Sequence, residues 1–300
     1  MKGKGMLKVS LLVLVLLCSG LLISCTGGQE NRVIIGADNT AEEAILSEML
    51  KLLIEHHTDI EVELVGDLRG GETVLHPAIL SGEIDMYPEY TGTAWKFILK
   101  REDIPERDEL NAELFAHYEK EFNIKWVGLY GFNNSYGLGL YKPIAEAYNI
   151  KTYSDLAKHS DELVFSCGGR FFERDDGFDG LVELYGIKFK KVVEMDQILG
   201  YDAIKSEDVD VILIFTTDGR LADTNLVVLE DDKNYFPSYL GGTVIRIETL
   251  EKYPELEEVL MKMNNILTDA EMQELNYKVE TLNESEEKVA SEFLRAKGMI

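Results

Sequence analysis

Aromatic side chains gather in four short segments of this sequence that also contain glycine, proline or polar residues. The segments are Met86–Thr93, Gly131–Tyr136, Phe215–Arg220 and Tyr235–Tyr239. Each adjoins a predicted strand, whereas a core aromatic would follow the apolar period of its own element. Ordinary loop packing explains any one segment, but four of them together predict a cluster of rings at a ligand-binding cleft.

Convergent rings suit a quaternary ammonium ligand, because such a cation has no N–H group for a conventional salt-bridge hydrogen bond. The negative faces of several aromatic rings can surround it instead, and each contact contributes roughly 0.5–2 kcal/mol. The four segments therefore favour binding of a small organic cation.

Motifs of catalysis and metal binding are missing from the sequence. It contains no GxxxxGK[ST], GxSxG, HExxH or CxxC pattern. The pair His56-His57 is adjacent rather than spaced i, i+4, so the two rings leave a helix in different directions. The doublets Asp175-Asp176 and Asp231-Asp232 are typical of solvated turns. We therefore expect no catalytic residue, no metal site and no cofactor.

The composition is that of a globular protein with two lobes. The 300 residues are too many for one small core and suit two lobes of roughly 100–150 residues each. Lys and Arg number 30 against 55 Asp and Glu, which gives a formal net charge of −25. A surface this acidic repels phosphate, which argues against a role in nucleic-acid binding.

The N-terminus has the pattern of an export signal. Lysines at positions 2, 4 and 8 precede the apolar run Leu11–Leu17, which fits the h-region of a signal peptide. The segment Leu22–Cys25 resembles a lipobox, in which the chain is cut before a cysteine that then receives lipid. We expect a signal peptide at 1–24, lipid on Cys25 and a tether at 25–30, which would hold the protein on the outer face of the cell membrane, extracellular or periplasmic. Secretion without lipid is the alternative.

Strands alternate with helices along most of the chain, which indicates an α/β fold with mostly parallel sheets. Beyond Tyr239 the pattern is helical, with a Thr268…Glu271 capping box and no strand, so this tail must pack on an earlier lobe. The expected strands are 33–36, 61–65, 84–87, 124–130, 136–141, 163–166, 209–215 and 226–230, and the main expected helices are 41–57, 72–80, 93–100, 110–122, 177–185, 254–266, 269–277 and 285–296.

From about Val33 to its C-terminus the sequence resembles substrate-binding proteins of ABC importers for glycine betaine, choline and carnitine. The likeness rests on Ser81–Ala94, Gly131–Tyr136, Thr216–Arg220, Leu229–Lys233 and Glu274–Tyr277, in that order. The resemblance implies a type II periplasmic-binding-protein fold, with two α/β lobes joined by a hinge. It places lobe one at 31–133 plus 238–300 and lobe two at 134–237.

The resemblance also implies which residues bind the ligand. The aromatic cage of the family falls on Tyr90, Tyr136, Phe215 and Tyr239, and Phe215 lacks the hydroxyl of the usual tyrosine. Thr93 matches a hydroxyl that contacts the polar end of the ligand. Arg174 matches an arginine that binds the betaine carboxylate in some members, and a structural salt bridge is the alternative for it.

Asp38 departs from the family, whose members often carry lysine or glutamine at this position. An ionised Asp38 repels a carboxylate and, near the cation, favours choline or another ligand without one. Alternatively, Asp38 pairs with Arg174 and the two charges cancel. Our hypothesis is that choline or an unusual trimethylammonium compound binds at least as well as glycine betaine. Ergothioneine-type compounds share the trimethylammonium group and are a further alternative.

The sequence thus predicts a monomeric, lipid-anchored binding protein that passes a quaternary amine to an ABC permease and its ATPase subunit. Ligand-driven closure of the two lobes would be its mechanism. One alternative is a sensory module that binds the same ligand and signals to a partner. Another is an enzyme on the same fold, because a fold does not fix a function.

Overall fold

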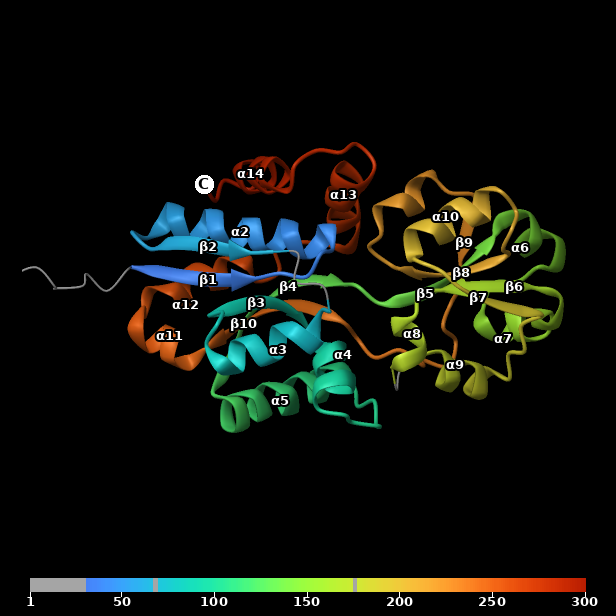
Figure 1. Cartoon of the computed structure of the whole chain (residues 1–300), viewed down its shortest axis with the longest axis horizontal. Coiled ribbons are helices and arrows are strands. Elements are labelled where there is room, and N and C mark those ends of the chain that lie inside the picture. The colour runs from blue at the N-terminus through green and yellow to red at the C-terminus, as the bar shows by residue number, and fades with distance from the viewer. Residues whose placement is uncertain (1–30, 67–69, 175–176) are drawn as a thin grey trace, which may run out of the picture. The chain divides into compact units, whose positions relative to one another are not determined.

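Ten strands form the centres of two α/β lobes in the computed structural model, which describes residues 31–66, 70–174 and 177–300 (Figure 1). The strands are β1 (Arg32–Gly36), β2 (Glu61–Val65), β3 (Met86–Tyr90), β4 (Ile124–Asn133), β5 (Tyr136–Tyr141), β6 (Val164–Cys167), β7 (Lys191–Glu194), β8 (Val211–Phe215), β9 (Leu226–Val228) and β10 (Leu240–Arg246). They make two five-stranded sheets, with the orders β2-β1-β3-β10-β4 and β7-β6-β8-β5-β9. The expected architecture of two α/β lobes is confirmed.

Helices cover both faces of each sheet, as Figure 1 shows for α2 and α14 on one side of the first sheet and α3 and α5 on the other. The helices of the first lobe are α2 (Ala41–His57), α3 (Glu72–Ser81), α4 (Thr91–Thr93), α5 (Arg107–His117), α11 (Ile247–Lys252), α12 (Glu255–Leu260), α13 (Asp269–Glu280) and α14 (Glu286–Ala296). Those of the second lobe are α6 (Lys142–Tyr148), α7 (Tyr153–Ala157), α8 (Arg170–Glu173), α9 (Phe178–Tyr185) and α10 (Gln197–Lys205). The predicted capping box of α13 is present, with Thr268 and Glu271 bonded reciprocally.

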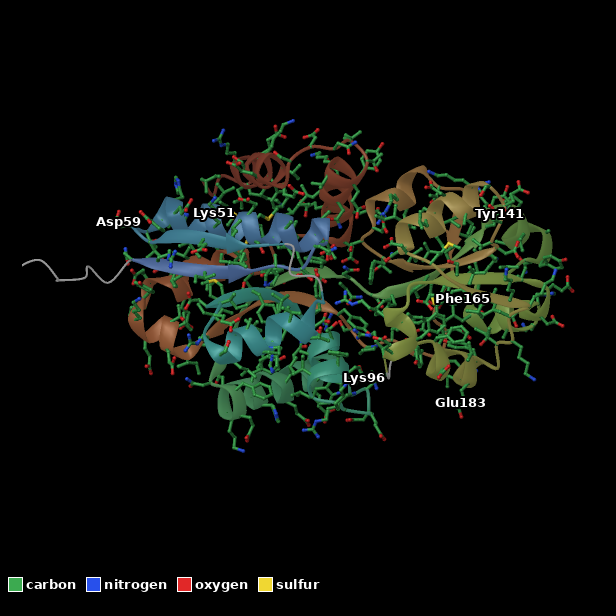
Figure 2. The ribbon with its side chains drawn as sticks, in the orientation of Figure 1. Lys51, Asp59, Lys96, Tyr141, Phe165 and Glu183 are labelled. Carbon is green, nitrogen blue, oxygen red and sulfur yellow. The ribbon has the colours of Figure 1, made fainter. Side chains whose placement is uncertain are left out.

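Apolar side chains fill the space between the sheets and their helices. In the first lobe, residues of α2, α13 and α14 pack with β1, β3 and β4 in one cluster, which buries the C-terminal helices against this lobe. In the second lobe Phe165 lies inside the structure, whereas the exposed Glu183 points outward (Figure 2). The ring of Phe165 stacks on Phe178 and Phe189, with centroid distances of 5.6 and 4.7 Å.

The expectations of mostly parallel sheets and of a tail without a strand are wrong. The sheets are mixed, because β10 runs antiparallel to β3 and β4, and β5 runs antiparallel to β8 and β9. The strand β10 was not predicted because it contains Gly241 and Gly242, and glycine is depleted in strands. The fold needs a small residue here, because a Cβ on Gly241 would lie 2.9 Å from Cζ of Phe132.

The chain passes between the two sheets twice, from β4 to β5 and from β9 to β10. The two crossing segments are hydrogen-bonded to each other. The backbone N–H of Asn134 donates to the carbonyl of Tyr239 at 3.0 Å, and the backbone N–H of Tyr239 donates to Oδ1 of Asn133 at 2.6 Å. This paired crossing fixes Tyr136 and Tyr239 close to each other at the junction of the lobes.

The N-terminal predictions are not addressed by the structure. The signal peptide at 1–24, the lipid on Cys25 and the tether at 25–30 lie outside the described residues. Within 31–66, 70–174 and 177–300, no helix combines the length and the apolar composition needed to cross a membrane.

Candidate functional site

A cavity of about 1260 Å³ lies where elements of both lobes meet. The seven residues predicted to bind ligand all line it: Asp38, Tyr90, Thr93, Tyr136, Arg174, Phe215 and Tyr239. They come from six regions of the chain, so the fold brings together side chains that are up to 201 positions apart (239 − 38). Their contact with a ligand stays a prediction.

Tyr136 is the central ring of the aromatic group. It opposes Phe215 in the β5–β8 ladder, and the two ring centroids are 5.1 Å apart. The ring of Tyr239 meets Tyr136 edge-on at 5.8 Å. Phe171 and Phe236 also flank Tyr136, with centroids at 5.4 and 5.6 Å. These two rings were not predicted as site residues, and Phe236 was identified only as part of an aromatic segment.

Tyr90 reaches the cavity from the other lobe, at the end of β3. Its ring packs edge-on against Phe132 with a centroid distance of 6.4 Å. The expected strand ended at Tyr87, but β3 continues through Pro88 because it pairs with β10 over five residues. The next turn is tight, since a Cβ on Gly92 would lie 2.6 Å from the ring of Tyr239.

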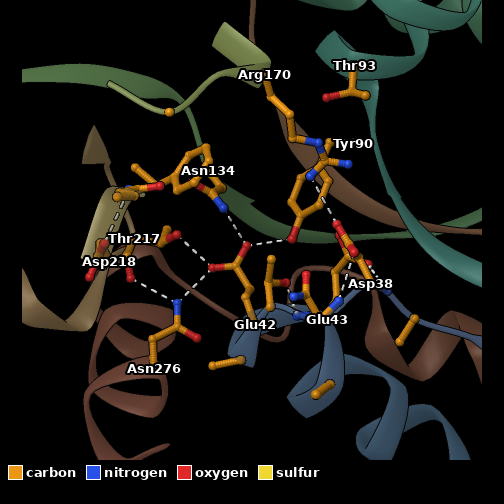
Figure 3. Close-up of a pocket in the computed structure, with 18 of the residues that line it drawn as sticks. Asp38, Glu42, Glu43, Tyr90, Thr93, Asn134, Arg170, Thr217, Asp218 and Asn276 are labelled. Atoms are coloured by element: carbon orange, nitrogen blue, oxygen red, sulfur yellow. Dashed lines mark hydrogen bonds and ion pairs between the residues drawn. The ribbon is translucent and has the colours of Figure 1, made fainter. Parts of the chain in front are cut away.

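Glu42, in the first turn of α2, is the residue that sequence reasoning missed. Its buried carboxylate accepts four hydrogen bonds (Figure 3). Oε1 accepts from the hydroxyl of Tyr90 at 2.6 Å and from Nδ2 of Asn134 at 2.7 Å. Oε2 accepts from the hydroxyl of Thr217 at 2.6 Å and from Nδ2 of Asn276 at 2.8 Å. Burial raises the pKa of Glu42, and these four hydrogen bonds oppose that rise.

The sequence contained partial signals for this network. Asn134, Thr217 and Asn276 lie inside segments that carry the family resemblance, although no role was assigned to them. Glu42 itself had no signal, because an acidic residue in the first turn of a helix is ordinarily explained by the helix dipole.

Asp38 forms an ion pair with Arg170, through Oδ2 and Nη1 at 3.2 Å (Figure 3). The alternative drawn from the sequence was that Asp38 pairs with Arg174, and Arg170 was not considered as its partner. Arg174 lies over the ring of Tyr136, with its guanidinium carbon 5.3 Å from the centroid. The charge of Asp38 is thus balanced within the protein, while Arg174 already covers one ring of the predicted cage.

The cavity lining is strongly acidic, with eleven Asp and Glu side chains against three arginines. The closest basic contact among them is a forked ion pair in which Arg220 binds both oxygens of Asp218 at 2.9 Å. An excess of carboxylates in a partly enclosed site attracts cations and disfavours anions. Among the described residues, no group of three or more His, Cys, Asp or Glu side chains could hold a metal ion.

Glu89 lies beneath the cavity wall and is only 1% exposed. Its carboxylate accepts from the backbone N–H of Tyr90 at 2.7 Å and from the hydroxyl of Tyr87 at 2.8 Å. Burial, followed by the charge of Glu72, raises the pKa of Glu89 to about 8. Burial also raises the pKa of Glu43, which accepts from the backbone N–H of Asp38. The raised pKa of Glu89 favours its protonated form.

The chain is similar to known proteins over nearly its whole length. Residues 31–296 match the model of a family described as the substrate-binding domain of the ABC-type glycine betaine transport system. The chain is 41% identical over 293 residues to the ergothioneine transport permease/ergothioneine binding protein of Helicobacter pylori; the match covers 97% of this chain and 52% of that protein, so this chain spans about half of that relative.

Two further relatives match over nearly their full length. The chain is 37% identical over 290 residues to the carnitine transport binding protein of Listeria monocytogenes, with 94% of each chain covered. A solved structure described as a glycine betaine/carnitine/choline ABC transporter aligns with a TM-score of 0.79 at 36% identity, covering 89% of this chain and 99% of that one. The prediction of a binding protein rather than an enzyme is confirmed by these relatives.

The raised pKa of Glu89 makes stability depend on pH. Glu89 binds its proton more tightly in the folded chain than in the unfolded chain, where the pKa is near 4.5. Its contribution is therefore complete below about pH 4.5 and is lost as the pH rises through about 8, at up to about 1.4 kcal/mol of unfolding free energy per pH unit. Glutamine mimics the protonated acid, so Glu89→Gln should flatten this decline and raise stability at pH 8–9.

Denaturant unfolding at one-unit steps from pH 5 to pH 9 measures this effect. Glu83→Gln is the matched control, because Glu83 is exposed and lies close in the chain. Parallel stability curves for the wild type and Glu89→Gln would contradict the prediction.

Proposed function

Because this chain belongs to the family of substrate-binding domains of ABC-type glycine betaine transport systems, we propose that it captures a small quaternary ammonium compound for an ABC importer. The observation that carries this proposal is the group formed by Tyr136, Phe215 and Tyr239, with Tyr90 facing the same cavity. Aromatic faces bind a cation that cannot donate hydrogen bonds. The acidic lining adds a field that draws such a cation in.

Closure of the two lobes on the ligand is the proposed mechanism. We propose that lobe one is 31–133 plus 238–300 and lobe two is 134–237, a division that agrees with the strands of the two sheets. Tyr90 then comes from lobe one, and Tyr136 and Phe215 come from lobe two. Because the ligand needs rings from both lobes, it stabilises the closed form that the permease recognises.

The proposed ligands are choline, glycine betaine, carnitine and ergothioneine, which share a trimethylammonium group. Relatives of this chain are named for ergothioneine and for carnitine. Thr93 and Arg174 line the cavity and are the groups proposed for the polar end of the ligand. The partners are an ABC permease and its ATPase subunit, and the chain acts as a monomer without a cofactor.

Attachment to the outer face of the membrane through lipid on Cys25 completes the proposal. The motif Leu22–Cys25 supports it, since leucine three positions before the cysteine and a small serine just before it suit the peptidase. The lipid would keep the binding protein near its permease.

The first prediction of this proposal concerns the cage. We expect the mature protein to bind at least one of the four compounds with micromolar or tighter affinity, and Tyr136→Ala to weaken that binding roughly tenfold or more, because the central ring is lost. Isothermal titration calorimetry measures both. Tyr148→Ala is the control, since Tyr148 is 45% exposed and lies outside the cavity lining. Equal affinities for the wild type and Tyr136→Ala would rule out the cage.

The second prediction concerns Asp38. We expect choline to bind at least as tightly as glycine betaine in the wild type. In Asp38→Asn the guanidinium of Arg170 loses its anionic partner and can attract the carboxylate of glycine betaine. The affinity for glycine betaine should therefore rise severalfold relative to the affinity for choline. The measurement is the ratio of the two dissociation constants in both proteins. Glycine betaine binding tenfold tighter than choline in the wild type would refute the preference.

The third prediction concerns the anchor. Cys25→Ser should move the protein from the membrane fraction to the soluble fraction, because serine cannot take the thioether-linked lipid. Cys18→Ser is the matched control, as Cys18 lies in the same segment but follows Val15-Leu16-Leu17, without the small residue that cleavage requires. Fractionation and intact mass measure the outcome, and an unchanged distribution of Cys25→Ser would contradict the lipid anchor.

A further inference from the structure

The carboxylate of Glu42 is buried without a cation of the protein beside it. Glu42 is 5% exposed, yet all four groups that donate to it are neutral: one phenol, one alcohol and two amides. No Lys, Arg or His in the described part of the chain lies within ion-pair distance of it. The four hydrogen bonds favour the charged form of this carboxylate against its burial, and a nearby cation would balance that negative charge.

The other buried acids at the cavity are Asp38, Asp218 and Glu43. Burial raises the pKa of Glu43 well above its usual range, which favours its neutral form. Asp38 is paired with Arg170, and Asp218 is held by both ends of the guanidinium of Arg220. Their charges are therefore compensated inside the protein. Glu42 is the acid at this cavity that combines deep burial with four neutral donors, and it lines the cavity that carries the aromatic rings.

Glu42 is also bonded directly to a ring of the predicted cage. The hydroxyl of Tyr90 donates to Oε1 at 2.6 Å, which is the short distance of a charge-assisted hydrogen bond. Such a bond draws the phenol proton toward the carboxylate and leaves more negative charge on the oxygen and on the ring. A ring with more negative charge on its face attracts a cation more strongly.

The same carboxylate orients a second group at the cavity. By accepting from Nδ2 of Asn134, Glu42 fixes that amide. Oδ1 of Asn134 is left buried with no hydrogen-bond partner in the described structure.

We propose that Glu42 supplies the counter-charge for the ligand's ammonium group and that it acts mainly through Tyr90, as a positioning residue. The inference rests on the proposed function and deepens it, because it says what the site selects for: the positive charge of the ligand, in addition to its shape. Asp38, which the sequence suggested for this role, is neutralised by Arg170.

A charged ligand and its uncharged isostere test the proposal. Choline and 3,3-dimethylbutan-1-ol have the same shape, but carbon replaces the quaternary nitrogen in the alcohol. The ratio of their dissociation constants measures how strongly the site selects for charge. In Glu42→Gln, which keeps the size of the side chain, this ratio should fall by about 3- to 10-fold while the affinity for the alcohol stays within about twofold.

Two further variants separate the effect of Glu42 on Tyr90 from the electrostatic field of the whole acidic lining. Glu286→Gln removes one charge from the same cavity lining, but in the described structure no hydrogen bond joins Glu286 to the rings. The ratio should therefore fall less in this variant than in Glu42→Gln. Tyr90→Phe removes the hydroxyl that joins the ring to Glu42, so it should lower choline affinity as well. Both changes break the same hydrogen bond. The double variant should therefore lose less choline-binding free energy than the sum of the losses in the two single variants.

Several results would overturn the inference. Equal weakening of choline and of the alcohol in Glu42→Gln would assign Glu42 a purely structural role. An unchanged ratio, an equal fall in Glu286→Gln, or additive losses in the double variant would show that Glu42 does not act through Tyr90. Absence of binding of any trimethylammonium compound to the wild type would instead refute the proposed function, and this inference with it.

Discussion

The pairing of the two crossing segments is the constraint on which the site depends. Asn133 and Asn134 at the end of β4 are bonded to Tyr239 just before β10. Two hydrogen-bonded crossings hold the junction of the lobes in place more firmly than one crossing would. Tyr136 follows Asn134 by two positions and Tyr239 belongs to the pairing itself, so the backbone holds their rings near each other. The aromatic group is therefore built at the crossing between the lobes.

The balance of charge around the cavity follows a consistent pattern. Arginines neutralise Asp38 and Asp218, and protonation neutralises Glu89, whose pKa is about 8. Each of these acids thus has a partner or a protonation state that reduces its net charge in the fold. Glu42 differs because hydrogen bonds from neutral groups, rather than a cation, offset its burial. A site that binds a permanent cation benefits from a buried carboxylate without a cationic partner, and Glu42 is bonded to Tyr90 at one side of this cavity.

The hydrogen bonds to Glu42 serve the stability of the fold as well as the proposed binding site. Glu42 joins α2 to Asn276 of α13, to Thr217 after β8 and to Asn134 between the lobes. The loop that begins at Thr217 also packs closely on α13, since a Cβ on Gly219 would lie 2.2 Å from the backbone nitrogen of Tyr277. A contact this tight links the loop after β8 to the C-terminal helices. The carboxylate that we propose to attract the ligand thus also holds together elements from distant parts of the chain.

The sequence by itself determined the α/β alternation, helices such as 41–57 with an exact match to α2, and the aromatic segments that carry Tyr90, Tyr136, Phe215 and Tyr239. Those features are local, because periodicity, caps and aromatic type are encoded within a few residues. Only the tertiary structure revealed that Leu240–Arg246 is a central strand, since its two glycines weaken the local signal and pairing with both neighbours overrides it. Only the tertiary structure revealed Glu42 as a hub and Arg170 as the partner of Asp38. Their partners lie up to 234 positions away, and the charge that a carboxylate retains depends on which groups the fold brings to it.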